Sequence, residues 1–402
     1  MDPAEPQKQT SVGKRLLVQI SGYDPRGVNF YYPLFSREAE KFGAKAGIDV
    51  RVGPRSRWRR HWREWTTATN SPDHAPHVRT LFLVWDDIVR AHWHRSRFAL
   101  FRNAIGTYLS YLRTGLVSRA WRINRTPLIA LLFPAVGFFF IHLLFIGGFG
   151  GLGFVVAAHS GVDSWLSWPA ALAGALLGAF LAHKITPFLG GTWLIQTYCF
   201  CHRLALDPIP ELETRLEEQV NDLLDLLHED PPDELLISSH SVGTIIAILF
   251  LQKFLERGSW NGRISLLTLG QTIPLATFVQ PQAGWLISRL QTVATHENVD
   301  WVDFTMPSDG ACFALHDPLR ASVDNPVHYP NPDSPKILSA RFMEGFSPDR
   351  YKALRRDKYQ FHFQYLRTPD KPADFDYPDV VLGNKRLPAR FHHRQNQARD
   401  PT

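Results

Sequence analysis

The sequence predicts an α/β fold in which a mostly parallel sheet carries helices on both faces and is interrupted by a transmembrane helical hairpin. Three observations support this prediction. Short apolar runs alternate with helical patterns, which is typical of parallel sheets. A serine stands in a tight turn between one such run and an apolar helix. Two apolar runs near the middle of the chain are each long enough to cross a bilayer.

The alternation of strands and helices is found in both halves of the chain. The apolar runs predict strands at residues 15–21, 48–52, 78–85, 234–238, 264–269, 299–305 and 337–342, with helices at 32–47, 209–228 and 244–251. Many of these strands are apolar throughout, so both faces of the sheet should be covered. We therefore expect residues 1–95 and 207–382 to form one core. The polar and basic residues 383–402 are expected to be disordered.

The intervening residues 96–206 are predicted to be an arginine-rich membrane-surface segment followed by two transmembrane helices, at about 127–147 and 165–187. No Asp or Glu occurs from Ile88 to Val162, although that stretch holds eight arginines. Arginines before the first span, and Lys184 and Arg203 after the second, predict a cytoplasmic location for both flanks in an inner membrane. A pair of buried core helices is the alternative interpretation.

A second basic and aromatic segment, Arg55–Trp65, contains three tryptophans among its arginines. This composition suits either single-stranded nucleic acid or a membrane surface with anionic lipid. The nearby arginine-rich segment favours lipid, so we expect a bilayer partner and no nucleic acid. The three cysteines of the 402-residue chain form neither a disulfide framework nor a metal cluster, and no cofactor motif is present.

The segment Ser239–Gly243 has the pattern of a nucleophile elbow. It follows the predicted strand at 234–238 and precedes the apolar helix at 244–251. This strained turn needs small residues two positions before and after the nucleophile, and Ser239 and Gly243 occupy those positions. The candidate nucleophile is therefore Ser241. The first glycine of the usual pattern is replaced by Ser239.

A serine nucleophile needs a histidine base that is oriented by a carboxylate. In an elbow-containing sheet these residues follow the serine in the order acid, then histidine. Asp309 follows the strand at 299–305 and is the preferred acid, with Asp317 as the alternative. His362 lies in an aromatic segment after the last predicted strand and is the preferred base.

An oxyanion formed during acyl transfer needs backbone N–H donors. One donor is expected from Val242, the residue after the nucleophile. The other is expected from Tyr23, because residues 22–27 form a Gly- and Pro-containing loop directly after the first strand. An ordinary turn is the alternative interpretation of that loop.

With these motifs the chain resembles the α/β-hydrolase superfamily, and within it the membrane-inserted, lipase-like bacterial serine hydrolases. The resemblance covers roughly residues 15–90 and 207–380. It implies ester cleavage through an acyl-enzyme on Ser241, acting on a lipid or acyl ester. Ser239 and the membrane hairpin before the elbow depart from the family pattern. An inactive hydrolase-fold membrane scaffold and an acyltransferase with the same triad are the alternatives. The oligomeric state has no sequence signature.

Overall fold

The computed structural model describes residues 11–399 except 76, 124, 162 and 186–190. It divides into two compact units. The first, the sheet unit, comprises the described residues up to Trp93, Tyr111–Pro127 and the residues from Cys201 onward. The second, the hairpin unit, comprises His94–Ser110 and Leu128–Phe200. The predicted boundary at 96–206 therefore differs from the structure, since Tyr111–Pro127 groups with the sheet.

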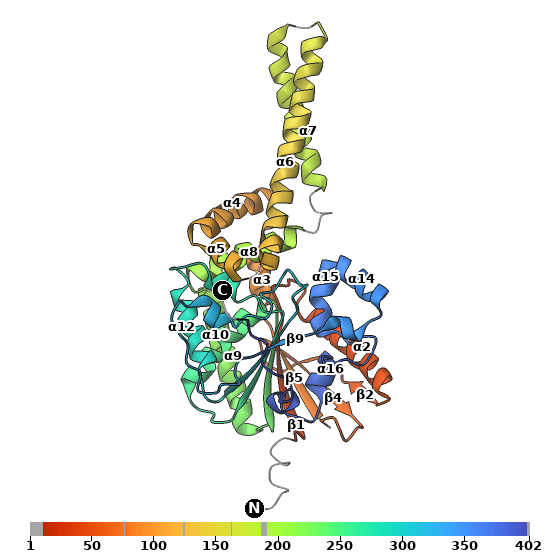
Figure 1. Cartoon of the computed structure of the whole chain (residues 1–402), viewed down its shortest axis with the longest axis vertical. Coiled ribbons are helices and arrows are strands. Elements are labelled where there is room, and N and C mark those ends of the chain that lie inside the picture. Colours follow the sequence, from red (N-terminus) through yellow and green to blue (C-terminus); the bar gives the residue numbers. More distant parts are fainter. Residues whose placement is uncertain (1–10, 76, 124, 162, 186–190, 400–402) are drawn as a thin grey trace, which may run out of the picture. The chain divides into compact units, whose positions relative to one another are not determined.

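The sheet unit is an α/β structure whose described residues form one nine-stranded sheet (Figure 1). Its order is β2-β4-β5-β1-β6-β7-β8-β9, with β3 paired to β4. Neighbours from β5 to β9 are parallel, whereas β4 is antiparallel to β5, β2 and β3. The strands are β1 (Lys14–Ile20), β2 (Val50–Val52), β3 (Ser56–Arg57), β4 (Trp62–Thr69), β5 (His77–Leu83), β6 (Glu234–His240), β7 (Ile264–Leu269), β8 (Val299–Thr305) and β9 (Lys336–Ser339).

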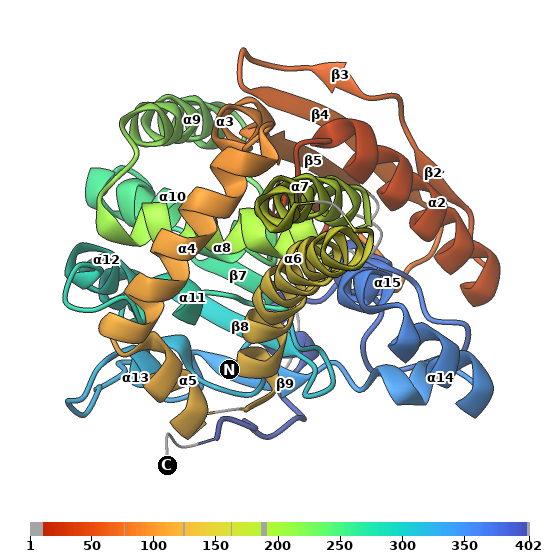
Figure 2. The same ribbon diagram turned by 90° about the horizontal axis from the view of Figure 1, so that it is seen from above.

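Helices cover both faces of this sheet, as the apolar strands predict. On one face α9, α10 and α12 pack together, while α2, α15 and α16 lie on the other (Figure 2). The helices of this unit include α2 (Val28–Ala46), α3 (Asp86–His92), α5 (Leu116–Ile123), α9 (Pro210–Glu229), α10 (Gly243–Arg257), α11 (Pro274–Thr277), α12 (Gly284–Ala294), α13 (Pro318–Ser322), α14 (Pro348–Arg356), α15 (Lys358–His362), α16 (Tyr377–Leu382) and α17 (Leu387–Arg390), with 3-10 turns at Phe342–Gly345 and Phe363–Leu366.

The segment Arg55–Trp65, for which the sequence favours a contact with anionic lipid, contributes to the sheet. It forms β3 and the start of β4. Trp62 and Trp65 are fully buried, at 0% and 1% exposure. Their rings pack against the core residues Phe250 and Phe82. Two of the three tryptophans of this segment are therefore core residues, whereas Arg55, Arg57, Arg59 and Arg60 remain exposed.

The polar tail also differs from its prediction, because residues 383–399 are packed and not disordered. The buried guanidinium of Arg15 donates to the backbone carbonyls of Val381, Gly383 and Lys385. It also pairs with Glu234 at 2.7 Å, and both side chains are at most 1% exposed. An unpaired buried charge is costly, so the tail supplies acceptors that Arg15 needs. Composition could not indicate this, since the partner lies at the other end of the chain.

In the described residues of the hairpin unit, all of the regular secondary structure is helical. It contains α6 (Arg125–His159) from Leu128 onward, α7 (Ser167–Ile185), most of α4 (Arg97–Arg113) and α8 (Gly191–Leu206), and a 3-10 turn at Ser164–Leu166. Small residues let α6 and α7 approach closely. A Cβ on Gly174 or Gly178 would lie 2.1 Å from the carbonyl oxygen of Phe149 or Phe145, respectively. Such glycine contacts are typical of helix pairs in membranes. Helix α6 itself continues through the five glycines at positions 147, 148, 150, 151 and 153.

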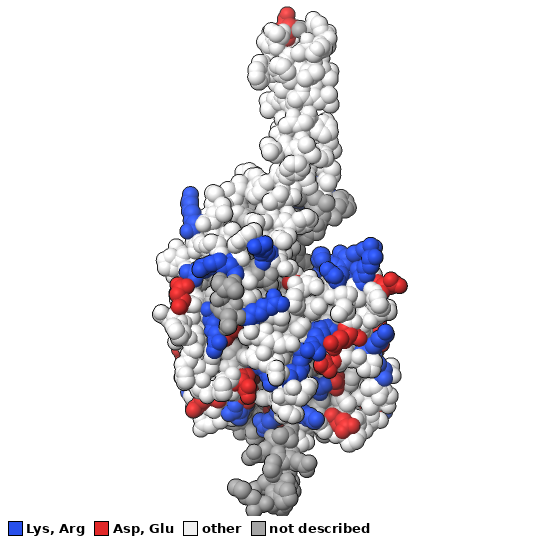
Figure 3. Space-filling view, in the orientation of Figure 1, with Lys and Arg blue, Asp and Glu red and all other residues white. Residues whose placement is uncertain are grey.

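Two helices are long and apolar enough to cross a membrane, Arg125–His159 and Ser164–Ile185. Only 18% and 17% of their most apolar stretches are buried, unlike the helices of a protein core. Figure 3 shows no Lys or Arg side chains on the visible outer part of this helix pair. The predicted second span also included residues 186 and 187, which lie outside the described residues.

Candidate active site

Ser241 occupies a strained turn between β6 and α10. Its backbone φ is 56°, a left-handed conformation that a residue with a side chain seldom adopts. The turn is held because the Ser241 N–H donates to Leu269 O at 2.9 Å. Gly243 is required two residues later, since a Cβ there would lie 2.5 Å from Ser21 O and 2.8 Å from Ile20 O. Strain at a serine held between strand and helix is the geometry of a nucleophile elbow.

His362 and Asp309 form a buried pair. Nδ1 of His362 lies 2.7 Å from Oδ2 of Asp309, and their side chains are 12% and 3% exposed. Burial raises the pKa of the Asp309 carboxyl, but His362, the Ala311 N–H and the Cys312 thiol together lower it by more, so the net pKa is below its usual value. Asp309 also accepts the Ala311 N–H at 3.0 Å. An ionised Asp309 therefore fixes the His362 tautomer with its proton on Nδ1.

The opposite nitrogen of His362, Nε2, is buried and has no hydrogen-bond partner. With the proton on Nδ1, this nitrogen carries a lone pair that can accept a proton. A buried acceptor without a donor is uncommon in folded proteins and calls for an explanation. Nε2 of His362 could therefore accept a proton from a donor placed beside it.

Ser241 and His362 both lie close to the end of β7. Ser241 contacts Leu269, and His362 lies beside Gly270. Leu269 accepts the Ser241 N–H, and a Cβ on Gly270 would lie 3.3 Å from Cε1 of His362. Gly270 also has a positive φ of 57°. A Cβ there would lie only 2.7 Å from Cε2 of Tyr365, so a larger residue would clash first with Tyr365 and would also crowd the His362 ring. The Ser241 hydroxyl makes no hydrogen bond to Nε2 in this state.

The predicted oxyanion donors flank the elbow. Strand β1 pairs directly with β6, so the loop after β1 lies beside Ser241. A Cβ on Gly22 would lie 3.2 Å from Cβ of Ser241. The Gly22 N–H donates to the Tyr31 hydroxyl at 3.3 Å, and Tyr23 follows it at the same edge. Val242 precedes α10, where the first N–H groups lack acceptors within the helix.

Asp317, the alternative acid, has a different role. Its carboxylate accepts the backbone N–H groups of Leu319 and Arg320 at the start of α13. It also accepts the Tyr329 hydroxyl at 2.6 Å. Asp317 thus caps a helix and contacts no residue of the elbow. Among the two candidate acids, only Asp309 contacts His362.

Sequence reasoning missed His240, which lies directly before Ser241. Its Nε2–H donates to the backbone carbonyl of His362 at 3.1 Å, and its ring centroid is 4.8 Å from that of His362. Burial, and secondarily the charge of His362, lowers the pKa of His240 to about 3. His240 is therefore neutral at ordinary pH and holds the backbone that carries the base. In the sequence, only the position of His240 inside the elbow segment Ser239–Gly243 could have indicated that it belongs to the site.

Arg26 lies in the loop after β1 and contacts both that loop and α15. Its guanidinium donates to both oxygens of Asp24, at 2.9 and 2.6 Å, and also to the Tyr359 hydroxyl. Its Cζ stacks 3.6 Å from the Phe30 ring centroid. Tyr359 lies on α15, the helix that ends at His362. Arg26 therefore joins the loop after β1 to the helix that carries the histidine.

No family model, curated protein or solved structure matches this chain. The functional interpretation therefore depends on the geometry of the site. In the parts of the chain that the structure describes, no group of three or more His, Cys, Asp or Glu residues could hold a metal ion.

Proposed function

We propose that the protein is an α/β-hydrolase-like serine hydrolase that cleaves carboxylic esters. One observation carries the proposal. Ser241 stands in a left-handed turn between strand and helix, at the same sheet edge as a buried His362–Asp309 pair. All three residues follow strands of the parallel part of the sheet, whose carboxyl ends meet at one edge.

In the proposed reaction, Oγ of Ser241 attacks the ester carbonyl while Nε2 of His362 takes its proton. The carbonyl oxygen becomes an oxyanion that accepts hydrogen bonds from the Val242 and Tyr23 amides. Asp309 stabilises the imidazolium through Nδ1. His362 then returns the proton to the leaving alkoxide, and an acyl-enzyme remains. Water, activated by the same nitrogen, hydrolyses this ester and restores the serine.

We also propose that α6 and α7 anchor the enzyme in an inner membrane, with the sheet unit on the cytoplasmic side. The apolar, exposed character of both helices supports anchoring. The arginines flanking α6 support the orientation. A lipid or acyl ester is then the natural substrate class. A reporter fused after Thr402 should be active only in the cytoplasm, and an active periplasmic reporter would refute this orientation.

Labelling with a fluorophosphonate probe tests the proposed chemistry. The full-length protein in detergent should be labelled, and Ser241→Ala should abolish both labelling and ester hydrolysis. Ser239→Ala is the matched control, because it changes a buried serine in the same turn and leaves Ser241 in place. A folded wild-type protein that is neither labelled nor active would favour the inactive scaffold. If the protein is labelled and transfers acyl groups to an alcohol or amine but hydrolyses esters only slowly, the acyltransferase alternative is favoured.

A further inference from the structure

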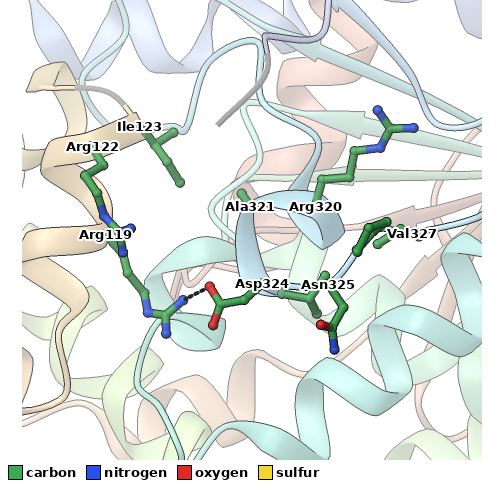
Figure 4. A pocket seen from close by; sticks show the side chains of 10 residues that line it. Arg119, Arg122, Ile123, Arg320, Ala321, Asp324, Asn325 and Val327 are labelled. Carbon is green, nitrogen blue, oxygen red and sulfur yellow. Dashed lines mark hydrogen bonds and ion pairs between the residues drawn. The ribbon is translucent and has the colours of Figure 1, made fainter. Parts of the chain in front are cut away.

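A cavity of about 520 Å³ lies in the sheet unit, away from Ser241 and its partners. One wall is α5, and the other is α13 with the loop that follows it (Figure 4). Its lining residues are Arg119, Arg122, Ile123, Arg320, Ala321, Val323, Asp324, Asn325, Pro326 and Val327. The volume is in the range of sites for small ligands. None of these residues takes part in the proposed ester cleavage.

The charged groups of this cavity favour an anion. The lining includes three arginines, Arg119, Arg122 and Arg320, and one acidic residue, Asp324. Arg119 and Arg122 are three residues apart on α5, so their side chains share one helix face. The Arg119–Asp324 contact is loose, at 3.5 Å, and the Asp324 side chain is 82% exposed. Such an exposed pair contributes little, so it neutralises the site only weakly.

The third guanidinium is only loosely engaged by a carboxylate. Arg320 Nε lies 3.6 Å from Asp317 Oδ2, an oxygen that already accepts the Tyr329 hydroxyl. The other oxygen of Asp317 caps α13. Guanidinium groups bind phosphate oxygens through paired N–H donors, which makes a phosphate group the anion that best fits an arginine-lined cavity.

The course of the chain beside the cavity indicates where such a phosphate would come from. Ile123 lines the cavity, and α6 begins two residues later at Arg125. Trp121 of α5 is 55% exposed, and Cζ of Arg125 lies 4.6 Å from its ring centroid. Exposed tryptophan beside arginine at the start of an apolar helix is typical of the lipid headgroup level.

We propose that this cavity binds the phosphate of an anionic phospholipid headgroup. The inference depends on the proposed insertion of α6 into a membrane, but not on the ester chemistry. The bound lipid would hold the sheet unit at the bilayer surface through Arg119, Arg122 and Arg320. The shared chemistry is a phosphate ester anion, so free phosphate is the competing source that the experiment must separate.

The test measures binding of short-chain phosphatidylglycerol to the full-length protein in detergent, in a Ser241→Ala background so that no ester is cleaved. Inorganic phosphate and short-chain phosphatidylcholine are measured in parallel. Arg119→Gln/Arg122→Gln should weaken phosphatidylglycerol binding by about 10- to 100-fold. Arg102→Gln/Arg113→Gln is the matched control, because it removes two exposed arginines from the same acid-free segment outside the cavity.

A gain-of-binding variant guards against misfolding. Asp324→Asn removes the cavity carboxylate and should strengthen phosphatidylglycerol binding, an effect that a folding defect cannot imitate. Equal losses of phosphatidylglycerol binding in the cavity variant and in its control would show a general electrostatic attraction to the basic segment and would overturn the proposed site. Inorganic phosphate binding as tightly as phosphatidylglycerol would overturn the lipid assignment. Unchanged binding in the folded cavity variant, or tighter binding of phosphatidylcholine, would also overturn it.

Discussion

The imidazole rings of His240 and His362 lie 4.8 Å apart between centroids, and the His240 Nε2–H donates to the backbone carbonyl of His362. This contact ties the residue before the proposed nucleophile to the residue proposed as the base. Burial keeps the His240 ring neutral and outweighs the effect on its pKa of the hydrogen bond to His362, which by itself favours the protonated ring. This burial has a measurable consequence for stability as a function of pH.

His240 should make the folded protein less stable as the pH falls. Its pKa is about 3 in the folded protein and about 6.5 when unfolded. Between these values the unfolded chain binds a proton that the folded chain cannot, so the free energy of unfolding decreases from pH 6.5 downward. His240→Gln should reduce this slope by up to about 1.4 kcal/mol per pH unit. Urea unfolding at several pH values measures the slope.

A second buried histidine provides the control for that measurement. Burial lowers the pKa of His316 to about 4, so its contribution should remain in the His240→Gln variant. His316→Gln should reduce the slope separately. If the slope of His240→Gln equals that of the wild type, His240 is not the buried neutral histidine described here.

Substitution of the two candidate acids, Asp309 and Asp317, should have different effects on the rate of ester hydrolysis. Asp309→Asn should lower kcat for ester hydrolysis by about 10⁴-fold, because the amide cannot stabilise the imidazolium or fix its tautomer. Asp317→Asn should leave kcat nearly unchanged, since Asp317 caps α13. Steady-state kinetics of both purified variants gives the comparison. A larger loss in Asp317→Asn would show that the acid assignment is wrong although the serine mechanism could stand.

Arg26 should act as a positioning residue. Arg26→Met removes the link from the loop after β1 to Tyr359, and Tyr359→Phe removes the same link from the other side. Each should lower kcat by about 10- to 100-fold, because small displacements of the base are costly. The double variant should be little worse than either single variant.

Two measurements distinguish positioning by Arg26 from general destabilisation. KM should change less than kcat, since the proposed role concerns the base and not substrate binding. Arg37→Met is the matched control, because Arg37 is an exposed arginine paired with its neighbour Glu38 on α2. Additive losses in the Arg26/Tyr359 double variant would refute the link.

The packing of the C-terminal tail should depend on its hydrogen bonds with Arg15. Arg15→Met leaves Glu234 buried without its partner and should cost about 3–5 kcal/mol of stability. Thermal unfolding measures the loss, and trypsin should cleave faster after Lys385 and Arg390 because their segment loses its anchor. Arg51→Met, which breaks an exposed pair with Asp49, should cost at most about 1 kcal/mol. A tail that stays protected in Arg15→Met would contradict this role.

Local patterns determined the elements that lie in the core. The strands at 264–269 and 299–305 have the predicted bounds, and every residue in them is buried because both faces of the sheet are covered. The turn at Ser241 was also visible in the sequence, since strand, small residues and helix follow one another within a few positions. No strand was predicted at β4, because its tryptophans lie among basic residues, a composition that is also typical of an interface.

Tertiary structure decided the contacts between residues far apart in the chain. The sequence offered Asp309 and Asp317 for the same role, and only the fold of the loop after β8 placed Asp309 against His362. Likewise, the composition of the tail is that of a disordered segment, but buried Arg15 needs the tail's carbonyl groups. The hydrophobic periodicity of a segment indicates which of its residues are buried. It cannot report which distant group will satisfy a buried charge, because that depends on the three-dimensional path of the chain.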